Sequence, residues 1–556
     1  MTVKSAFNPQ IVWALGLPLL LVALVYAPGF GGFWIGDDLT NLHHYFVWAQ
    51  DGRLWSDSWA RFFQGISVEG SAYRPLSILS LSANYALAGS DYAGWYASNY
   101  VVHLANSALI ALLVLRLAAH NGLAGHLAAA LAALLFGLAP TLAEGVYWLS
   151  ARADGWVTLL TLGALFIWIG PPKRQPVAGA PLVDRNLRRQ NALRVGIALC
   201  LLILGLGFKE SAAVFPLQLT LLAFFWPSRL GAARWLILIG SYLLLMGFFV
   251  WRAHLFGHAF WVYATPGAEA VSIDWLGRLY AALLSLGPWW SALTAQANVL
   301  SAMYLLILPI AICLLIVSGR HRQRFIALAL FGAGAGMALA TVLNLGALLP
   351  HGEGGRLSYG PIAWFALGIG VLASGSLKRA QQGAVLALGV CVLAGAALLI
   401  EQLTRVWRAQ DSLAALVAAL PDYVNQNGGY TLLLVPETDG QVVMLRNGQG
   451  AMALPPLQEH GLLDRLLPSL PSDISERHLR IAGGMITQFE QRHFQHLTGP
   501  EVARLYDPAA PRWPDNYACW SKHERRIVPL AKPDPADAAA WAQTLRDALP
   551  GCGLAN

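Results

Sequence analysis

The sequence predicts an α-helical polytopic membrane protein with about eleven transmembrane helices and a small soluble α/β domain at its C-terminal end. Of its 556 residues, 56% are hydrophobic and only 12% are charged. In soluble globular proteins roughly a quarter of the residues are charged. The apolar residues also occur in runs long enough to cross a hydrocarbon layer of about 30 Å.

The first apolar run, residues 11–27, is predicted to be an uncleaved membrane span, because many more such runs follow it. A cleaved signal peptide is the alternative interpretation. A loop of about residues 29–95 comes next and is rich in Trp, Tyr and Phe, so amphipathic helices at the membrane interface are expected there. The stretch 76–90 is too short and too polar to span and is assigned to this loop.

The remaining spans and the basic connectors predict the orientation of the chain. Further spans are predicted at about residues 97–118, 126–143, 155–170, 195–209, 211–226, 234–251, 298–317, 325–349, 361–376 and 383–400. Basic residues gather in connectors that share one side with the N-terminus: Lys173, Arg174, Arg185, Arg188, Arg189, Arg194, Arg229, Arg234, Arg320, Arg322, Arg324, Lys378 and Arg379. The positive-inside rule makes that side cytoplasmic, so the net charge of +7 requires no nucleic-acid partner.

The composition changes after residue 400, which divides the chain into a transmembrane domain (1–400) and a soluble α/β domain (401–556). In the second domain, residues 413–424 are predicted to form a helix and residues 429–436 a strand. The orientation above places this domain and the first loop outside, which in a bacterium is the periplasm. Cys519 and Cys552 can then pair in an oxidising compartment, whereas Cys200, Cys313 and Cys391 fall in apolar spans and are expected to pack there.

The most prominent polar feature is the acidic pair Asp37 and Asp38, directly after the first span. Carboxylates at the mouth of a membrane segment are costly to place without a function. A pair of them suits a general base, or a site that binds a cation. The alternative is the exposed acidic start of a surface helix, since Asp favours helix N-termini.

Other charged residues lie at span ends on the same predicted outer face. They are Arg74, Glu144, Arg152, Asp154, Lys209, Glu210 and Arg356, with Tyr359 close to the last. Arg binds phosphate in a bidentate manner and Lys adds a point charge, so these cations suit a phosphate leaving group beside an apolar groove for a lipid tail. Salt bridges that tie helices together are the alternative, with Arg152 paired to Asp154 or Lys209 to Glu210.

Several short motifs, in this order along residues 1–376, resemble the GT-C superfamily of membrane glycosyltransferases. The similarity is greatest to the protein O-mannosyltransferase-like branch, which includes the transmembrane-and-TPR O-mannosyltransferases. The motifs are Asp37-Asp38, Tyr73-Arg74-Pro75-Leu76, the trio Asn99, His103 and Asn106, the stretch Glu144 to Asp154, Lys209-Glu210, and Arg356-Leu357-Ser358-Tyr359-Gly360-Pro361. Two features depart from this family: Gly355 stands where an acidic residue is expected before the arginine, with Glu353 nearby, and no TPR repeats follow.

The resemblance implies a GT-C fold and an inverting transfer of a sugar from a polyprenyl-phosphate-linked donor to a hydroxyl acceptor. Asp37 or Asp38 would be the general base, and the other charged residues, with Tyr359, would bind donor phosphate and substrate. If a divalent metal takes part, Asp37 and Asp38 would bind it, and no other cofactor is implied. The acceptor can be a glycan, a lipid or a protein.

Two other classes of function stay open on the sequence. A transporter or flippase of lipid-linked sugars would also place charges inside a helix bundle, although the two related halves common in transporters are not evident. A scaffold whose soluble domain binds cell-wall polymer is the third hypothesis.

Overall fold

A computed structural model describes most of the chain. The described residues are 9–64, 72–118, 122–170, 184–225, 231–259, 299–345, 355–375, 379–439, 442–445, 448–470, 480–482, 485–488, 514–532 and 538–554. The chain forms two compact units. The first, which we call the helical unit, comprises Met1–Pro28, Ser58–Ser80 and Tyr96–Leu403, and the second, the sheet unit, comprises Gly29–Asp57, Leu81–Trp95 and Thr404–Asn556. The bipartite division predicted at residue 400 stays a prediction, because each unit here gathers several stretches of chain.

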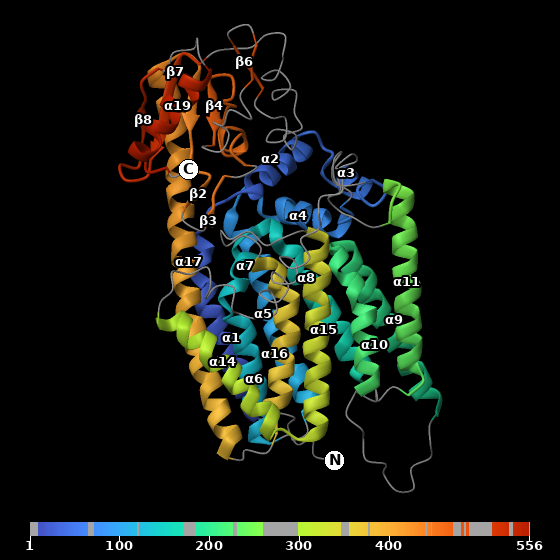
Figure 1. Cartoon of the computed structure of the whole chain (residues 1–556). Coiled ribbons are helices and arrows are strands. Elements are labelled where there is room, and N and C mark those ends of the chain that lie inside the picture. The colour runs from blue at the N-terminus through green and yellow to red at the C-terminus, as the bar shows by residue number, and fades with distance from the viewer. Residues whose placement is uncertain are drawn as a thin grey trace. The chain divides into compact units, whose positions relative to one another are not determined.

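The helical unit consists of long helices that run side by side (Figure 1). They are α1 (Pro9–Tyr26), α5 (Tyr92–Leu117), α6 (Leu123–Gly137), α8 (Arg152–Ile169), α9 (Asp184–Phe208), α10 (Phe215–Phe225), α11 (Ala233–Phe256), α14 (Val299–Ser318), α15 (His321–Leu345) and α16 (Tyr359–Ala373). Short elements join some of them: η2 (Pro140–Leu142), α7 (Glu144–Tyr147), η3 (Leu149–Ala151), η4 (Glu210–Val214) and η5 (Gly355–Ser358). Four α-helices have residues in both units: α3 (Leu54–Ala60), α4 (Pro75–Ala88), α5 and α17 (Arg379–Asn427).

The described helices confirm a polytopic membrane protein. Seven of them are long and apolar enough to cross a membrane, and α6 with its bent continuation makes up to eight. Each of the eleven stretches predicted as spans coincides with a helix, although α10 and the described part of α14 are shorter apolar helices and α15 is not among the seven. The stretch assigned to the first loop forms α4, whose 14 residues measure about 21 Å, less than a bilayer core.

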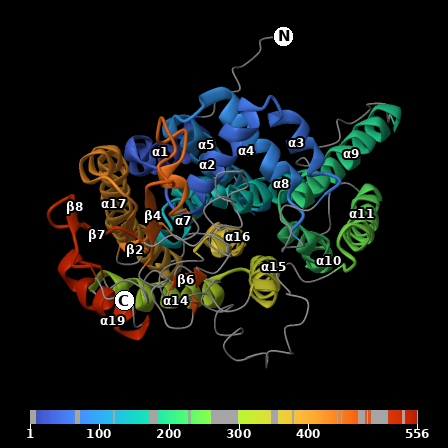
Figure 2. The same ribbon diagram turned by 90° about the horizontal axis from the view of Figure 1, so that it is seen from above.

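Burial distinguishes inner from outer helices of the helical unit. In α16 every residue except Phe365 is buried, and this helix packs against α15, α6 and α8. Figure 2 shows α16 beside α15. In contrast, α1, α9 and α11 expose leucines such as Leu17, Leu193 and Leu243. Apolar side chains on the outside of a helix bundle are what a lipid environment favours. Cys200 and Cys313 are among the exposed positions, so the expectation that they pack inside is wrong, while Cys391 is buried as expected.

The sheet unit is built on a four-stranded sheet in the order β4-β1-β7-β8. Its strands are β1 (Thr431–Leu434), β4 (Leu466–Ser469), β7 (Asn516–Ser521) and β8 (Arg526–Pro529). Both β4 and β7 pair in parallel with β1, and β8 pairs antiparallel with β7. The predicted strand at residues 429–436 is therefore confirmed as the central strand β1.

Smaller elements complete the sheet unit. They are α2 (Asp37–Gln50), the first residues of α3, the hairpin of β2 (Thr438–Asp439) and β3 (Val442–Val443), the hairpin of β5 (Arg480–Ala482) and β6 (Met485–Gln488), and α19 (Ala538–Ala548). The helix predicted at residues 413–424 is the last part of α17, which continues without a break through the composition change near residue 400.

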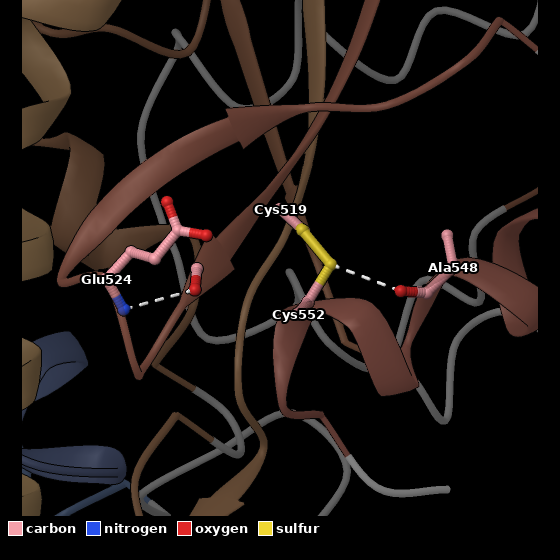
Figure 3. The surroundings of a disulfide bond; sticks show 5 residues. Cys519, Glu524, Ala548 and Cys552 are labelled. Atoms are coloured by element: carbon pink, nitrogen blue, oxygen red, sulfur yellow. Dashed lines mark hydrogen bonds between the residues drawn. A yellow bond between two sulfur atoms is a disulfide. The ribbon is translucent and has the colours of Figure 1, made fainter.

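A disulfide joins Cys519 on β7 to Cys552, which follows α19 (Figure 3), with 6.1 Å between the Cα atoms. This confirms the pairing expected from the sequence. Leu432, Leu434 and Tyr517 pack beside it in one buried cluster. Cys552 Sγ lies 3.3 Å from the Ala548 carbonyl oxygen, and this is a packing contact because a disulfide sulfur carries no proton to donate.

Some of the charged residues named from the sequence lie outside the described residues. They are Lys173, Arg174, Arg229, Glu353 and Lys378.

Candidate functional site

Glu144 and Arg356 form an ion pair between α7 and η5 in the helical unit. The Glu144 carboxylate accepts a hydrogen bond from the Arg356 guanidinium and a second, of 2.9 Å, from the Arg356 backbone N–H. The guanidinium carbon also lies 4.3 Å from the ring centroid of Trp148, within range of a cation–π contact. The side chain of Glu144 is only 3% exposed, whereas that of Arg356 is 27% exposed. The arginine is therefore held from one side and accessible from another.

The turn before Arg356 requires glycine. This explains why Gly355 stands where the resemblance to the GT-C superfamily predicts an acidic residue. A Cβ atom on Gly355 would lie 2.3 Å from the Thr141 carbonyl oxygen and 3.3 Å from Glu144 Oε2. An acidic side chain at this position would meet backbone and a like charge. Glycine at this position allows η5 to approach η2 closely.

Lys209 and Asp154 form a second ion pair, buried between the start of α8 and the end of α9. The Lys209 ammonium donates to both carboxylate oxygens of Asp154 at 2.7 Å. Each side chain is 8% exposed. Asp154 also lies in the first turn of α8, where the helix dipole favours a negative charge.

Glu210, next in sequence to Lys209, accepts hydrogen bonds from the Arg74 side chain and from the backbone of Tyr73. Arg74 Nε donates to Glu210 Oε2 at 3.1 Å, and the Tyr73 backbone N–H donates to Oε1 at 3.1 Å. Burial by itself would raise the pKa of Glu210, but the positive charge of Arg74, a backbone hydrogen bond, and the charges of Arg252 and Lys209 together outweigh it and lower the pKa below its ordinary value. The Arg74 side chain is 20% exposed.

Arg152 bonds to backbone. Its Nε donates to the Leu149 carbonyl at 3.1 Å and its Nη1 to the Ser80 carbonyl at 3.3 Å, and the residue is 2% exposed. The ion pairs that the sequence offered as alternatives were Arg152 with Asp154 and Lys209 with Glu210. The structure pairs Lys209 with Asp154 and Arg74 with Glu210, which joins different elements instead of sequence neighbours.

Tyr359, the first residue of α16, contacts a group of buried polar side chains on α5. His103 Nε2 donates to the Gly137 carbonyl at 3.0 Å, so its Nδ1 accepts the Tyr359 hydroxyl at 2.6 Å. Asn106 donates to the Gly155 carbonyl at 2.9 Å. Asp154 lies close enough to the Tyr359 hydroxyl to interact with it electrostatically.

The polar side chains of α5 stabilise an irregular stretch of backbone within the helix bundle. Between α6 and α8 the backbone is broken into η2, α7 and η3. Such backbone needs side-chain partners where water is scarce. Asn99 lies within hydrogen-bonding distance of the Val146 and Trp148 carbonyls, at 3.3 and 3.4 Å. The stretch that carries Glu144 and Arg152 is thereby fixed.

The acidic pair lies in the sheet unit, at the N-terminal end of α2. Gly36 directly before it has a φ of 54°, a conformation that favours glycine and turns the chain into the helix. Asp38 is 1% exposed, while Asp37 is partly exposed. The structure therefore brings Arg74, Glu144, Asp154, Lys209, Glu210, Arg356 and Tyr359 together at joined ends of helices in the helical unit, and places Asp37 and Asp38 in the sheet unit.

Sequence reasoning missed Arg252, which is 2% exposed near the end of α11 and interacts electrostatically with Glu210 and Arg74. Its guanidinium lies 5.8 and 6.0 Å from the ring centroids of Phe256 and Phe248. The signal was present, since a lone arginine that ends an apolar run is costly unless it serves a site. Within the described residues there is no group of three or more His, Cys, Asp or Glu side chains placed to hold a metal.

No family model matches this chain, and no curated protein matches it. Two solved structures are similar to it. One is ArnT from Cupriavidus metallidurans bound to undecaprenyl phosphate, with 12% identity, a TM-score of 0.46, and coverage of 94% of this chain and 98% of that one. The other is the arabinofuranosyltransferase AftD from Mycobacteria, with 14% identity, a TM-score of 0.40, and coverage of 78% of this chain and 30% of that one. Both TM-scores are below 0.5, so neither likeness decides what this chain does.

Proposed function

We propose that this protein is a GT-C-type membrane glycosyltransferase that transfers a sugar from a polyprenyl-phosphate-linked donor to a hydroxyl acceptor, with inversion, at the periplasmic face of a bacterial inner membrane. The observation that carries the proposal is the state of Arg356 and Arg74. Each is anchored by a carboxylate that is no more than 10% exposed, and each keeps part of its own side chain exposed. Such preorganised cations suit a phosphate that gains charge as its sugar leaves.

The Lys209–Asp154 pair has a different role in this proposal. Both side chains are enclosed, and the ammonium is held by two carboxylate oxygens. Lys209 therefore contributes positive potential and a fixed helix junction, while Arg356 and Arg74 contact the phosphate. Arg152 holds the backbone at Leu149 and Ser80, and Tyr359 bonds to the side chain of His103.

The base is assigned to the acidic pair. Asp37 is the partly exposed member and is therefore the group that takes the proton from the acceptor hydroxyl. Asp38 is buried and is the partner of Asp37 in the acidic pair. The leaving polyprenyl phosphate departs as the acceptor oxygen forms its bond to the anomeric carbon from the opposite face, which inverts the configuration.

The test is a turnover assay with purified protein and a labelled polyprenyl-phosphate sugar. We expect release of polyprenyl phosphate together with a glycosylated acceptor, and loss of both in Asp37→Asn. If the lipid-linked sugar crosses a proteoliposome membrane with its phosphate bond intact, the protein is a transporter instead. If both Asp37→Asn and Asp38→Asn retain near-normal turnover, the assigned base is wrong.

A further inference from the structure

The loop that follows β1, described over residues 435–439, 442–445 and 448–456, lies against the helix that carries the acidic pair. The Gly36 backbone N–H donates to the Met444 carbonyl at 2.7 Å, one residue before Asp37. Further along α2, His43 Nδ1 donates to the Pro455 carbonyl at 2.6 Å. The two bonds bracket Asp37 and Asp38 in the sequence.

Between these two bonds the contact is closer than a side chain allows. A Cβ atom on Gly448 would lie 2.3 Å from the Gly36 carbonyl oxygen and 3.0 Å from Leu39 Cδ1. The first of these is backbone, which has no flexible end to move aside. Gly448 thus lets the loop and the start of α2 meet main chain to main chain.

The loop is itself held by the sheet. It begins at the carboxyl end of β1, the strand flanked on both sides by parallel neighbours. The Met444 backbone N–H donates to the Glu437 carbonyl at 2.9 Å, and Lys522, which follows β7, donates to the Thr438 carbonyl at 3.2 Å. In α/β sheets the loops at the carboxyl ends of the strands commonly carry functional groups.

We infer that this loop, through Gly448 and through the bond from His43, sets the position of Asp37 and Asp38 and so controls the rate of sugar transfer. Gly448 and His43 are positioning residues. The C-terminal sheet then contributes to catalysis by positioning the base, in addition to any role in binding an acceptor. This inference rests on the proposed function, in which Asp37 is the base.

The first test is Gly448→Ala in the full-length protein. The added methyl group must displace the Gly36 carbonyl, and a misplacement of about 1 Å at a catalytic group can cost roughly a hundredfold in rate. We expect kcat to fall by about ten- to a hundredfold, with the Kd for undecaprenyl phosphate unchanged because the phosphate-binding cations are not touched. The matched control is Gly551→Ala in the same unit, where a Cβ atom meets nothing within 4 Å.

The second test uses a conservative rescue at His43. An Asn amide nitrogen can stand close to the position of Nδ1 and donate to the Pro455 carbonyl, whereas Leu cannot. We expect His43→Asn to retain more kcat than His43→Leu, again with the Kd for undecaprenyl phosphate unchanged. A role in stability alone would lower the midpoint temperature of thermal unfolding, without lowering kcat at an unchanged Kd.

The outcomes separate this inference from the proposed function. Loss of turnover in Asp37→Asn with normal kcat in Gly448→Ala and His43→Leu would overturn the inference and leave the proposed function standing. A parallel loss of kcat and donor binding in Gly448→Ala would also overturn it, since it would report general unfolding. Normal turnover in both single Asp variants would remove the proposed base, and the inference with it.

Discussion

The backbone and the side chain of Arg356 are both bonded to Glu144, so this arginine is fixed at two points by one carboxylate. A side chain held in this way loses little conformational freedom when it binds a ligand, and its planar fork matches a phosphate. The guanidinium carbon also lies over the ring of Trp148, 4.3 Å from its centroid. Of the three ion-paired cations Arg74, Lys209 and Arg356, the last is the most exposed, at 27%.

The first prediction concerns this arginine. Arg356→Ala should weaken the binding of undecaprenyl phosphate by about tenfold or more, since a hydrogen bond to a charged group contributes roughly 1.5–3 kcal/mol. Arg356→Lys should recover only part of this, because an ammonium lacks the fork and the stacking on Trp148. Titration of the tryptophan fluorescence with undecaprenyl phosphate would measure both. The control is Arg526→Ala, which removes an exposed arginine paired with Glu524. Equal affinities in all four proteins would make Arg356 a structural ion-pair partner only.

The buried pair of Lys209 and Asp154 gives the second prediction. Lys209→Met should destabilise the protein by about 3–5 kcal/mol, because it leaves the Asp154 carboxylate buried without its cation. Lys209→Met combined with Asp154→Leu should recover much of this stability, since replacing both charges can be nearly neutral. Thermal unfolding in detergent of the wild type, Lys209→Met, Asp154→Leu and the double variant completes a double-mutant cycle. Additive losses in the double variant would contradict a direct interaction.

The third prediction tests the tight turn at Gly355. Gly355→Ala should destabilise the protein by about 1–3 kcal/mol and weaken binding of undecaprenyl phosphate, because the new methyl group would displace the residue next to Arg356. Gly31→Ala is the matched control: both glycines lie in 3-10 turns, but a Cβ atom on Gly31 meets nothing within 4 Å. Normal affinity in Gly355→Ala would show that the turn adapts without moving the arginine.

Much of the fold was predictable because span length and hydrophobicity are written directly in the sequence. The eleven apolar stretches coincide with helices, and the charged residues that interrupt them lie at helix junctions, as Glu144 and Lys209 show. The 49-residue length of α17 was not predictable from composition, since a helix can pass from an apolar to a polar stretch without a breaker. Exposed cysteines in the spans were missed for a related reason: hydropathy does not tell which face of a span meets lipid.

The pairing of charges was harder to predict than their presence. Sequence proximity suggested Lys209 with Glu210, but adjacent residues project in different directions, so Lys209 bonds to Asp154, 55 positions earlier. Arg252 was overlooked because it follows the last hydrophobic run of α11 and belongs to no motif. The contact of Gly448 with Gly36 depends on two segments more than 400 residues apart, and nothing local in the sequence encodes it.

The disulfide gives the fourth prediction. Cys519→Ser with Cys552→Ser should lower the stability of the sheet unit by about 3–4 kcal/mol, since the bond closes a loop of 33 residues in the unfolded chain. Proteolysis of β7 and α19 under native conditions, with and without reductant, would measure the loss locally. Mass spectra of non-reduced peptides should show Cys519 joined to Cys552. Two free thiols in protein from intact cells would contradict both the bond and an oxidising compartment for this unit.

The last prediction concerns orientation, on which the periplasmic site depends. The connector between α14 and α15, with Arg320, and the first turn of α15, with Arg322 and Arg324, should be cytoplasmic by the positive-inside rule, and the sheet unit should be outside. Arg320 and Arg526 are both exposed, so each can be replaced by cysteine with little effect on packing. The background is Cys200→Ser with Cys313→Ser, because those two native thiols are exposed.

An impermeant maleimide applied to intact cells decides the orientation. We expect it to label Arg526→Cys, and to label Arg320→Cys only after the membrane is opened with detergent. The two variants serve as controls for each other, because labelling of both after detergent shows that both thiols are reactive. The opposite pattern would place the basic connector outside and the sheet unit inside. Asp37 would then lie in the cytoplasm with the sheet unit, and a donor presented at the periplasmic face could not be its substrate.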